Sequence, residues 1–242
     1  ASVNPNVSSF QLGPIASEIE AQTVRWIAEM IGYPVDCGGL LVSGGNMANF
    51  VCLLAGRKAR TPWDVRKEGM NNHRQVRIYC SAETHTWISK AADIFGFGTD
   101  AIRWIPTDTH LRMDVQSLEK QVEEDIGCGD VPLMAIGTAG SVATGAIDPL
   151  PLIAEICRAH NMWFHIDAAY GGFAAVLADA PADLKALTLA DSVAVDPHKW
   201  LYAPLEAGCV LVRDKKTLND AFSFKVSYYR FGSEDGEPPT NY

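Results

Sequence analysis

Long apolar runs are missing from this 242-residue chain, and none approaches the roughly 18 consecutive apolar residues of a membrane-spanning helix. The first residues, Ala-Ser-Val-Asn-Pro, have neither the charge nor the apolar core of a signal peptide. Basic residues are also scarce, since 20 lysines and arginines stand against 29 acidic residues and the formal net charge is −9. No basic cluster is present to neutralise phosphates. We therefore expect a cytoplasmic protein without nucleic-acid or membrane partners.

Paired cysteines and the common metal-binding spacings are missing as well. The six cysteines are scattered, several of them in apolar runs, which favours reduced core thiols over a disulfide framework. Neither Cys-x-x-Cys nor His-Glu-x-x-His occurs, and we expect no metal site. The glycine patterns of dinucleotide sites and P-loops are also absent.

What the chain does contain is a regular alternation of short apolar segments and amphipathic stretches. Ser17, followed by Glu20 at capping-box spacing, is interpreted as the cap of the first helix. The pattern predicts an α/β fold, a mostly parallel seven-stranded-type sheet flanked by helices. We expect one large domain over residues 1–231 and a polar mobile loop over 232–242. Strands are predicted at 39–42, 76–80, 102–105, 131–138, 162–166, 192–195 and 208–212, and helices at 17–31, about 46–60, 86–95, 114–125 and 150–160.

The strand at 192–195 runs into the segment Asp-Pro-His-Lys-Trp, which contains Lys199. Most lysines are solvated surface residues. This one follows the carboxyl end of a buried strand, among apolar and aromatic neighbours, where open α/β sheets bind their ligands. A desolvated lysine is more often the free amine, which can form an imine with an aldehyde. Lys199 is therefore a candidate nucleophile.

A second strand, at 162–166, ends at Asp167 and the small residues that follow it. Asp167 is either a turn or cap carboxylate, or the group that keeps a pyridinium nitrogen protonated and so makes the ring an electron sink. Ala169 would then be small because a flat ring lies against it. Asp167 and Lys199 are 199 − 167 = 32 residues apart, which leaves room for a helix and a return strand.

Three further segments carry weaker signals. Gly44, Gly45 and Asn46 precede a helix, where they form either a plain turn or an anion site suited to a phosphate. His85 follows the strand at 76–80, as a helix cap or as a ring that lies flat on an aromatic cofactor. Thr138 ends the strand at 131–138, as part of a connection or within reach of a cofactor hydroxyl or a substrate carboxylate.

Together and in this order, these segments resemble the group II decarboxylases that depend on pyridoxal 5'-phosphate (PLP). The resemblance extends from Pro14 to about Tyr229. Its most specific parts are D-P-H-K-W at 196–200 and H-I-D-A-A-Y-G-G at 165–172. It implies fold type I, with the large domain of the aspartate-aminotransferase-like PLP-dependent transferases, and a homodimer. The resemblance implies an amino acid as the small-molecule substrate, and family frequency favours an aromatic L-amino acid. Phe10, which we expect near the pocket, supports the same choice.

The same resemblance implies a role for each candidate residue. Lys199 would hold the cofactor as a Schiff base, His85 would stack on the ring, and Asp167 would bind the ring nitrogen. Ala169 would lie beneath the ring and Thr138 near its oxygen side. The residues implied around the phosphate are Gly44, Gly45, Asn46, Ser192 and His198.

Two departures from the family pattern stand out. Asn46-Met47 replaces a frequent Ser-Glu pair, although backbone amides can still bind the phosphate. Family members are about twice as long, so the N-terminal segment and the C-terminal small domain are expected to be absent or supplied as a separate segment. Other PLP chemistry stays open: an aldehyde-forming decarboxylase, a lyase or an aminotransferase. A non-catalytic binding protein is the alternative from another class.

Overall fold

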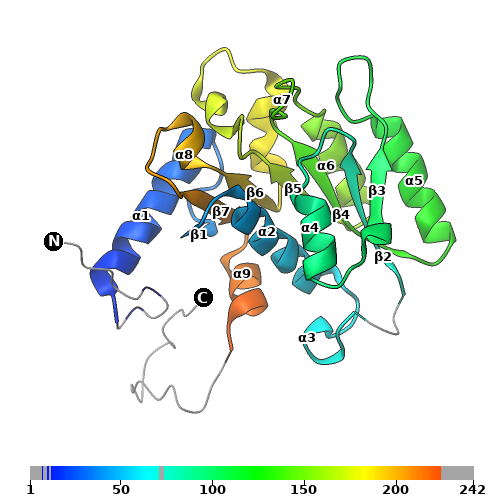
Figure 1. Ribbon diagram of the computed structural model, residues 1–242, viewed down its shortest axis with the longest axis horizontal. Helices are drawn as coiled ribbons and strands as arrows, with labels where there is room; N and C mark the ends of the chain where they lie inside the picture. The colour runs from blue at the N-terminus through cyan, green and yellow to red at the C-terminus, as the bar shows by residue number, and fades with distance from the viewer. Residues whose placement is uncertain (1–6, 8–9, 11, 71–73, 225–242) are drawn as a thin grey trace.

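The structure is a computed structural model and describes residues 7, 10, 12–70 and 74–224. Within them, one seven-stranded sheet has the order β1-β7-β6-β5-β4-β2-β3 (Figure 1). Only β7 runs against its neighbours, and the other strand pairs are parallel, which confirms the mostly parallel sheet. The strands are β1 (Gly38–Val42), β2 (Val76–Ser81), β3 (Ile102–Ile105), β4 (Val131–Thr138), β5 (Trp163–Asp167), β6 (Ser192–Val195) and β7 (Gly208–Val212).

Helices cover both faces of this sheet and give two apolar cores. Along β6, Val193 and Val195 belong to one core and Ala194 to the other, as expected for side chains that alternate across a strand. The first core contains residues of α1 (Pro14–Ile31), α5 (Val115–Gly127), α6 (Leu150–Ala159), η2 (Gly172–Val176), α7 (Ala182–Lys185) and η3 (Ala186–Leu189). The second contains residues of α2 (Gly45–Arg60), α4 (Trp87–Ile94) and α9 (Lys215–Phe222). The short elements α3 (Val65–Glu68), η1 (Thr99–Ala101) and α8 (Pro197–Trp200) lie in connections.

The beginning of α1 differs from the prediction. The helix starts at Pro14 with Gly13 as its N-cap, and the Ser17 N–H donates to the Gly13 carbonyl at 2.9 Å. Proline suits the first helical position because its φ is already helical and it has no N–H to satisfy. Among the residues that the structure describes, the buried Ser17 hydroxyl has no hydrogen-bond partner, so the capping-box interpretation is wrong.

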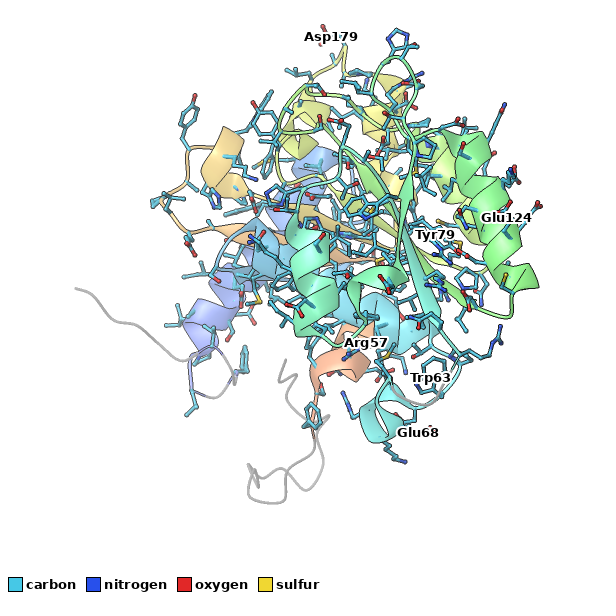
Figure 2. The ribbon with its side chains drawn as sticks, turned by 45° about the vertical axis from the view of Figure 1, so that its right-hand side comes forward. Arg57, Trp63, Glu68, Tyr79, Glu124 and Asp179 are labelled. Carbon is cyan, nitrogen blue, oxygen red and sulfur yellow. The ribbon has the colours of Figure 1, made fainter. Side chains whose placement is uncertain are left out.

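A buried polar network ties α5 to the sheet. The Tyr79 hydroxyl on β2 donates to Asp125 Oδ2 at 3.0 Å, and Arg103 on β3 donates to Asp125 Oδ1 at 2.6 Å. Figure 2 places Tyr79 in the interior beside α5. Burial and the adjacent carboxylate raise the pKa of Tyr79, so the phenol stays protonated and acts as a donor. The network therefore anchors α5 to β2 and β3, at one edge of the sheet.

The six cysteines all have free thiols, and five of them are buried, as expected for core thiols; Cys128 is exposed. Burial raises the pKa of the Cys52 thiol to about 12, so it stays protonated. No helix within 12–70 and 74–224 is long and apolar enough to cross a membrane. The loop predicted at 232–242 and the end of the predicted domain at 231 lie outside the described residues.

Candidate active site

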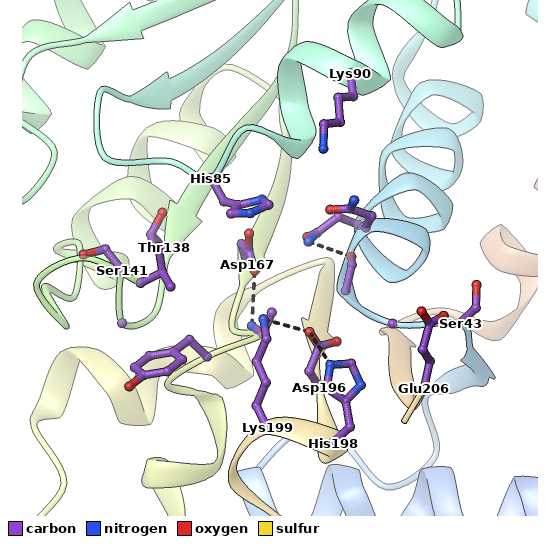
Figure 3. A pocket seen from close by; sticks show the side chains of 18 of the residues that line it. Ser43, His85, Lys90, Thr138, Ser141, Asp167, Asp196, His198, Lys199 and Glu206 are labelled. Carbon is purple, nitrogen blue, oxygen red and sulfur yellow. Dashed lines mark hydrogen bonds and ion pairs between the residues drawn. The ribbon is translucent and has the colours of Figure 1, made fainter. Parts of the chain in front are cut away.

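A cavity of about 500 Å³ opens where β4, β5 and β6 reach their carboxyl ends and α2 begins (Figure 3). This is the edge at which parallel α/β sheets bind ligands. Nine of the ten predicted site residues line it: Gly44, Gly45, Asn46, His85, Thr138, Asp167, Ala169, His198 and Lys199. The structure thus brings together segments that are far apart in the sequence.

Lys199 reaches this cavity from the short helix α8. Its Nζ lies 2.9 Å from Oδ2 of Asp196, a carboxylate that is only 1% exposed. The Ala207 N–H donates to His198 Nδ1 at 2.9 Å, so we assign the proton of the neutral ring to Nε2, which lies 3.8 Å from Asp196 Oδ2. Asp196 therefore holds the lysine amine in the cavity.

Asp167 ends β5 and is almost fully buried. Its Oδ2 accepts a hydrogen bond from Trp87 Nε1 at 2.8 Å, and its Oδ1 accepts one from the Ala169 N–H at 3.2 Å. Burial raises the pKa of Asp167, while these two donors and the charges of Lys199 and His85 lower it. A carboxyl group with raised proton affinity at the wall of a cavity is suited to share a proton with a ring nitrogen.

The start of α2 lines the cavity with Gly44, Gly45 and Asn46. Its N-cap is Gly44, with φ +93° and no side-chain cap, so the first amides lack the usual side-chain acceptor. A Cβ on Gly45 would lie 2.5 Å from Asp196 Oδ2, and one on Gly208 would lie 2.5 Å from the Gly44 carbonyl carbon. Both positions thus need glycine. The turn has the form of an anion site.

Thr138 and His85 complete the walls of the cavity. The Thr138 hydroxyl is buried and has no hydrogen-bond partner among the described residues, which suits an oxygen of a bound ligand. His85 is exposed and accepts a hydrogen bond from the Trp87 N–H through Nδ1 at 3.2 Å. Figure 3 shows its ring above Asp167, facing into the cavity.

Two expectations need correction. Ser192 does not line the cavity, because it begins β6, and at roughly 3.3 Å per residue the strand places it far from the end at which Lys199 follows. Its hydroxyl instead accepts from Trp163 Nε1 at 2.8 Å and contacts His165 Nδ1 at 2.9 Å. Phe10 lies beside α1 in a separate hollow, so it gives no support for an aromatic substrate.

Three residues of this site were not foreseen. The signal for Asp196 was available, because a carboxylate three residues before a lysine in a helical turn faces it. Asn49 lines the cavity and Trp87 binds Asp167, and both depend on contacts between layers that no local pattern reveals.

A lysine amine, a buried carboxyl, an unpaired hydroxyl and an uncapped helix start around one cavity define a class of protein that binds a phosphorylated aldehyde cofactor. The chemistry of these residues is suited to PLP: Lys199 would bind its aldehyde, Asp167 its ring nitrogen, Thr138 a ring oxygen and the start of α2 its phosphate. The chain belongs to the pyridoxal-dependent decarboxylase family, whose conserved domain it matches over residues 1–236.

Named relatives agree with this assignment. The chain is 35% identical to an aromatic-L-amino-acid decarboxylase of Bacillus atrophaeus, over 95% of this chain and 46% of that protein. It is 32% identical to the acidic amino acid decarboxylase GADL1 of Mus musculus, over 93% of this chain and 41% of that protein. The crystal structure of mouse CSAD superposes with a TM-score of 0.87 at 30% identity, covering 95% of this chain and 48% of that one. The chain thus spans less than half the length of these relatives.

Proposed function

We propose that this chain forms the cofactor-binding part of a PLP-dependent decarboxylase that converts an aromatic L-amino acid to its amine and CO2. The observation that carries the proposal is the placement of Lys199, Asp167 and the uncapped start of α2 around one cavity. Membership of the decarboxylase family supports the reaction type.

The residues divide the work as follows. Lys199 would bind the aldehyde group of the cofactor covalently, and Asp196 Oδ2, 2.9 Å from Lys199 Nζ, keeps the amine at that position. Asp167 would hold a proton on the ring nitrogen. The amides of α2 and the His198 ring would hold the phosphate. When bound, the cofactor would supply an electron-poor ring able to accept the electron pair released when the Cα–carboxylate bond of the substrate breaks and CO2 leaves.

The rim of the cavity offers a surface against which an aromatic side chain of the substrate can pack. Tyr170 lines the cavity and stands edge-on to Trp200, with ring centroids 6.0 Å apart. Val142 and Leu205 add apolar wall. The Bacillus atrophaeus relative, an aromatic-L-amino-acid decarboxylase, supports the same choice.

An acidic substrate is the second candidate, and one residue favours it. Lys90 points from α4 toward the cavity, and no ion pair of Lys90 is found with any residue that the structure describes (Figure 3). An unpaired cation there would attract an acidic side chain. Turnover of an amino-acid panel, with CO2 and the second product identified, decides between the two and separates an amine product from an aldehyde or a keto acid. Lys90→Met should abolish turnover of an acidic substrate and leave that of an aromatic one.

The first test is covalent capture of the cofactor. The chain is mixed with PLP, its near-ultraviolet and visible spectrum is recorded, and borohydride is added before peptide mapping. We expect a coloured adduct that is trapped on Lys199 and absent from Lys199→Ala. Lys120→Ala, an exposed lysine on α5, is the matched control. A folded full-length protein that gives no adduct on Lys199 would contradict the proposal.

Assembly and location remain predictions. A homodimer is in keeping with the exposed face of α1, where a second copy would cover large apolar side chains at helical spacing: Ile15, Ile19, Trp26 and Met30. Light scattering at several protein concentrations measures the oligomeric state directly. A cytoplasmic location likewise stays a prediction.

A further inference from the structure

One buried histidine outside the groups assigned above is linked to the cavity through hydrogen bonds. His165 lies on β5, two residues before Asp167, and has no exposed surface. Its Nε2 is 2.7 Å from Oδ1 of Asn49, which lines the cavity one turn into α2. Asn49 Nδ2 in turn donates to the Gly45 carbonyl at 2.9 Å. The middle of the sheet is thus connected to the first residue of α2.

The direction of these hydrogen bonds follows from their partners. Asn49 presents its oxygen to His165 because its nitrogen donates to Gly45, so Nε2 of the ring carries the proton. Nδ1 then accepts from the Ser192 hydroxyl at 2.9 Å, and that hydroxyl accepts from Trp163 Nε1 at 2.8 Å. Burial lowers the pKa of His165 to about 3, so the ring is neutral and this arrangement is retained across the physiological range.

A second contact packs the His165 ring against Trp87, whose indole also binds Asp167. The Trp87 indole stands edge-on to His165, with centroids 5.8 Å apart and an interplanar angle of 86°. Its Nε1 donates to Asp167 Oδ2. His165 and Asp167 also share one face of β5, since their side chains are two positions apart on a strand. His165 therefore lies between Asn49 and Trp87.

We propose that His165 and Asn49 are positioning residues that set the distance between the start of α2 and Asp167. This inference rests on the proposed function, in which α2 receives the phosphate and Asp167 the ring nitrogen. A cofactor of fixed length must meet the start of α2 and Asp167 at once. Hydrogen bonds join Gly45 to Asn49 and Asn49 to His165. The edge-on contact of His165 with Trp87 and the Trp87–Asp167 hydrogen bond complete the connection, which keeps that distance constant without touching the cofactor's reacting atoms.

Two amide substitutions of His165 distinguish the loss of its hydrogen bond to Asn49 from the loss of a buried ring. Gln places its amide where His165 has Nε2 and can still donate to Asn49, whereas Asn places its amide near Nδ1 and cannot reach. We expect His165→Asn to raise the Kd for PLP about tenfold and His165→Gln about threefold or less. Pyridoxal lacks the phosphate and does not span the two ends, so its Kd should change less than about twofold.

Further variants keep the test decisive. Asn49→Ala breaks the same link from the cavity side, and its effect should not add to that of His165→Asn. Tyr79→Phe, which removes a buried hydrogen bond to Asp125 outside the cavity, is the control for general destabilisation. In the cofactor-free protein, hydrogen exchange over residues 45–53 should be faster in His165→Asn than in the wild type or Tyr79→Phe.

The outcomes are distinguishable. A wild-type chain that binds PLP, together with folded His165→Asn and Asn49→Ala variants whose PLP-to-pyridoxal affinity ratio is unchanged, would overturn the positioning role and leave the proposed function intact. A full-length wild type that binds no PLP would overturn both. A lowered ratio with rescue by His165→Gln supports the role.

Discussion

The amine of Lys199 is paired with the carboxylate of Asp196, one helical turn earlier, at 2.9 Å. Asp196 is almost completely buried, and its second oxygen has no hydrogen-bond partner among the described residues. The pair thus keeps the amine of Lys199 in place at the wall of the cavity. Bond formation with an aldehyde requires this nitrogen to lie close to the aldehyde carbon, so Asp196 influences how readily the cofactor is captured.

Asp196→Asn should slow capture of the cofactor by Lys199. The substitution removes the ion pair at 2.9 Å that holds the amine in the cavity. We expect the rate of adduct formation with PLP, followed by absorbance at one fixed pH, to fall about tenfold. Asp179→Asn, at an exposed loop position, should behave as the wild type, and an unchanged rate in Asp196→Asn would rule the effect out.

Gly45→Ala should damage the phosphate site. The new Cβ would lie 2.5 Å from Asp196 Oδ2, so the start of α2 must shift and its amides lose their alignment. We expect the Kd for PLP to rise about tenfold or more, with the fold retained. Gly127→Ala is the matched control, because a Cβ there meets nothing within 4 Å. Equal binding by the two variants, measured by titration, would contradict the role of the turn.

Asp148 should make stability depend on pH. It accepts from the Met113 and Thr138 amides at 2.7 and 2.8 Å, yet burial raises its pKa to about 6 from an ordinary value of 3.8. Asp108 adds to this shift and Arg112 opposes it. The folded protein thus binds the proton more tightly than the unfolded chain.

This difference in proton binding determines the sign of the effect. The free energy of unfolding should fall, by about 3 kcal/mol from this group, as pH rises from about 4 to about 6. Urea unfolding at several pH values measures it. In Asp148→Asn this component should vanish, and stability at neutral pH should drop because one amide loses its acceptor. Parallel pH curves for the two proteins would refute the assignment.

Trp87→Phe should weaken catalysis more than cofactor binding. The substitution removes the indole N–H that donates to Asp167 Oδ2, so the pKa of Asp167 rises further and its carboxylate is less well held. We expect turnover to fall about tenfold, whereas the Kd for PLP should rise only about threefold because the phenyl ring can still pack against His165. Trp104→Phe, at a half-exposed position on β3, is the control. Unchanged kcat in Trp87→Phe would show that this hydrogen bond does not matter.

Much of the architecture was predictable because both faces of the sheet are covered. Strands buried on both faces appear as continuous apolar runs, and those of β4 and β6 agree with the prediction at both ends. The start of α1 was missed because two signals competed. Ser17 has the capping-box spacing, but Pro14 is already suited to the first helical position.

The site was predictable where chemistry follows the carboxyl end of a strand. Thr138, Asp167 and Lys199 all satisfy this rule, and the parallel sheet brings them to one edge. Ser192 is close to Lys199 in the sequence, but it begins β6 and does not line the cavity, so the prediction for this residue did not hold. Asn49 could not be predicted from the sequence, because its hydrogen-bond partner His165 is 116 residues away and belongs to the sheet.

The pairing of β1 with β7 also has a consequence for biosynthesis. Gly38 lies opposite Val212, 212 − 38 = 174 residues later, and Gly208 packs against Gly44 in the turn before α2. During translation the early strand must wait for a neighbour that leaves the ribosome much later, and such non-local pairing is slow. The turn that would hold the phosphate is therefore among the last parts to mature. We expect nascent chains that end before β7 to remain unable to load the cofactor.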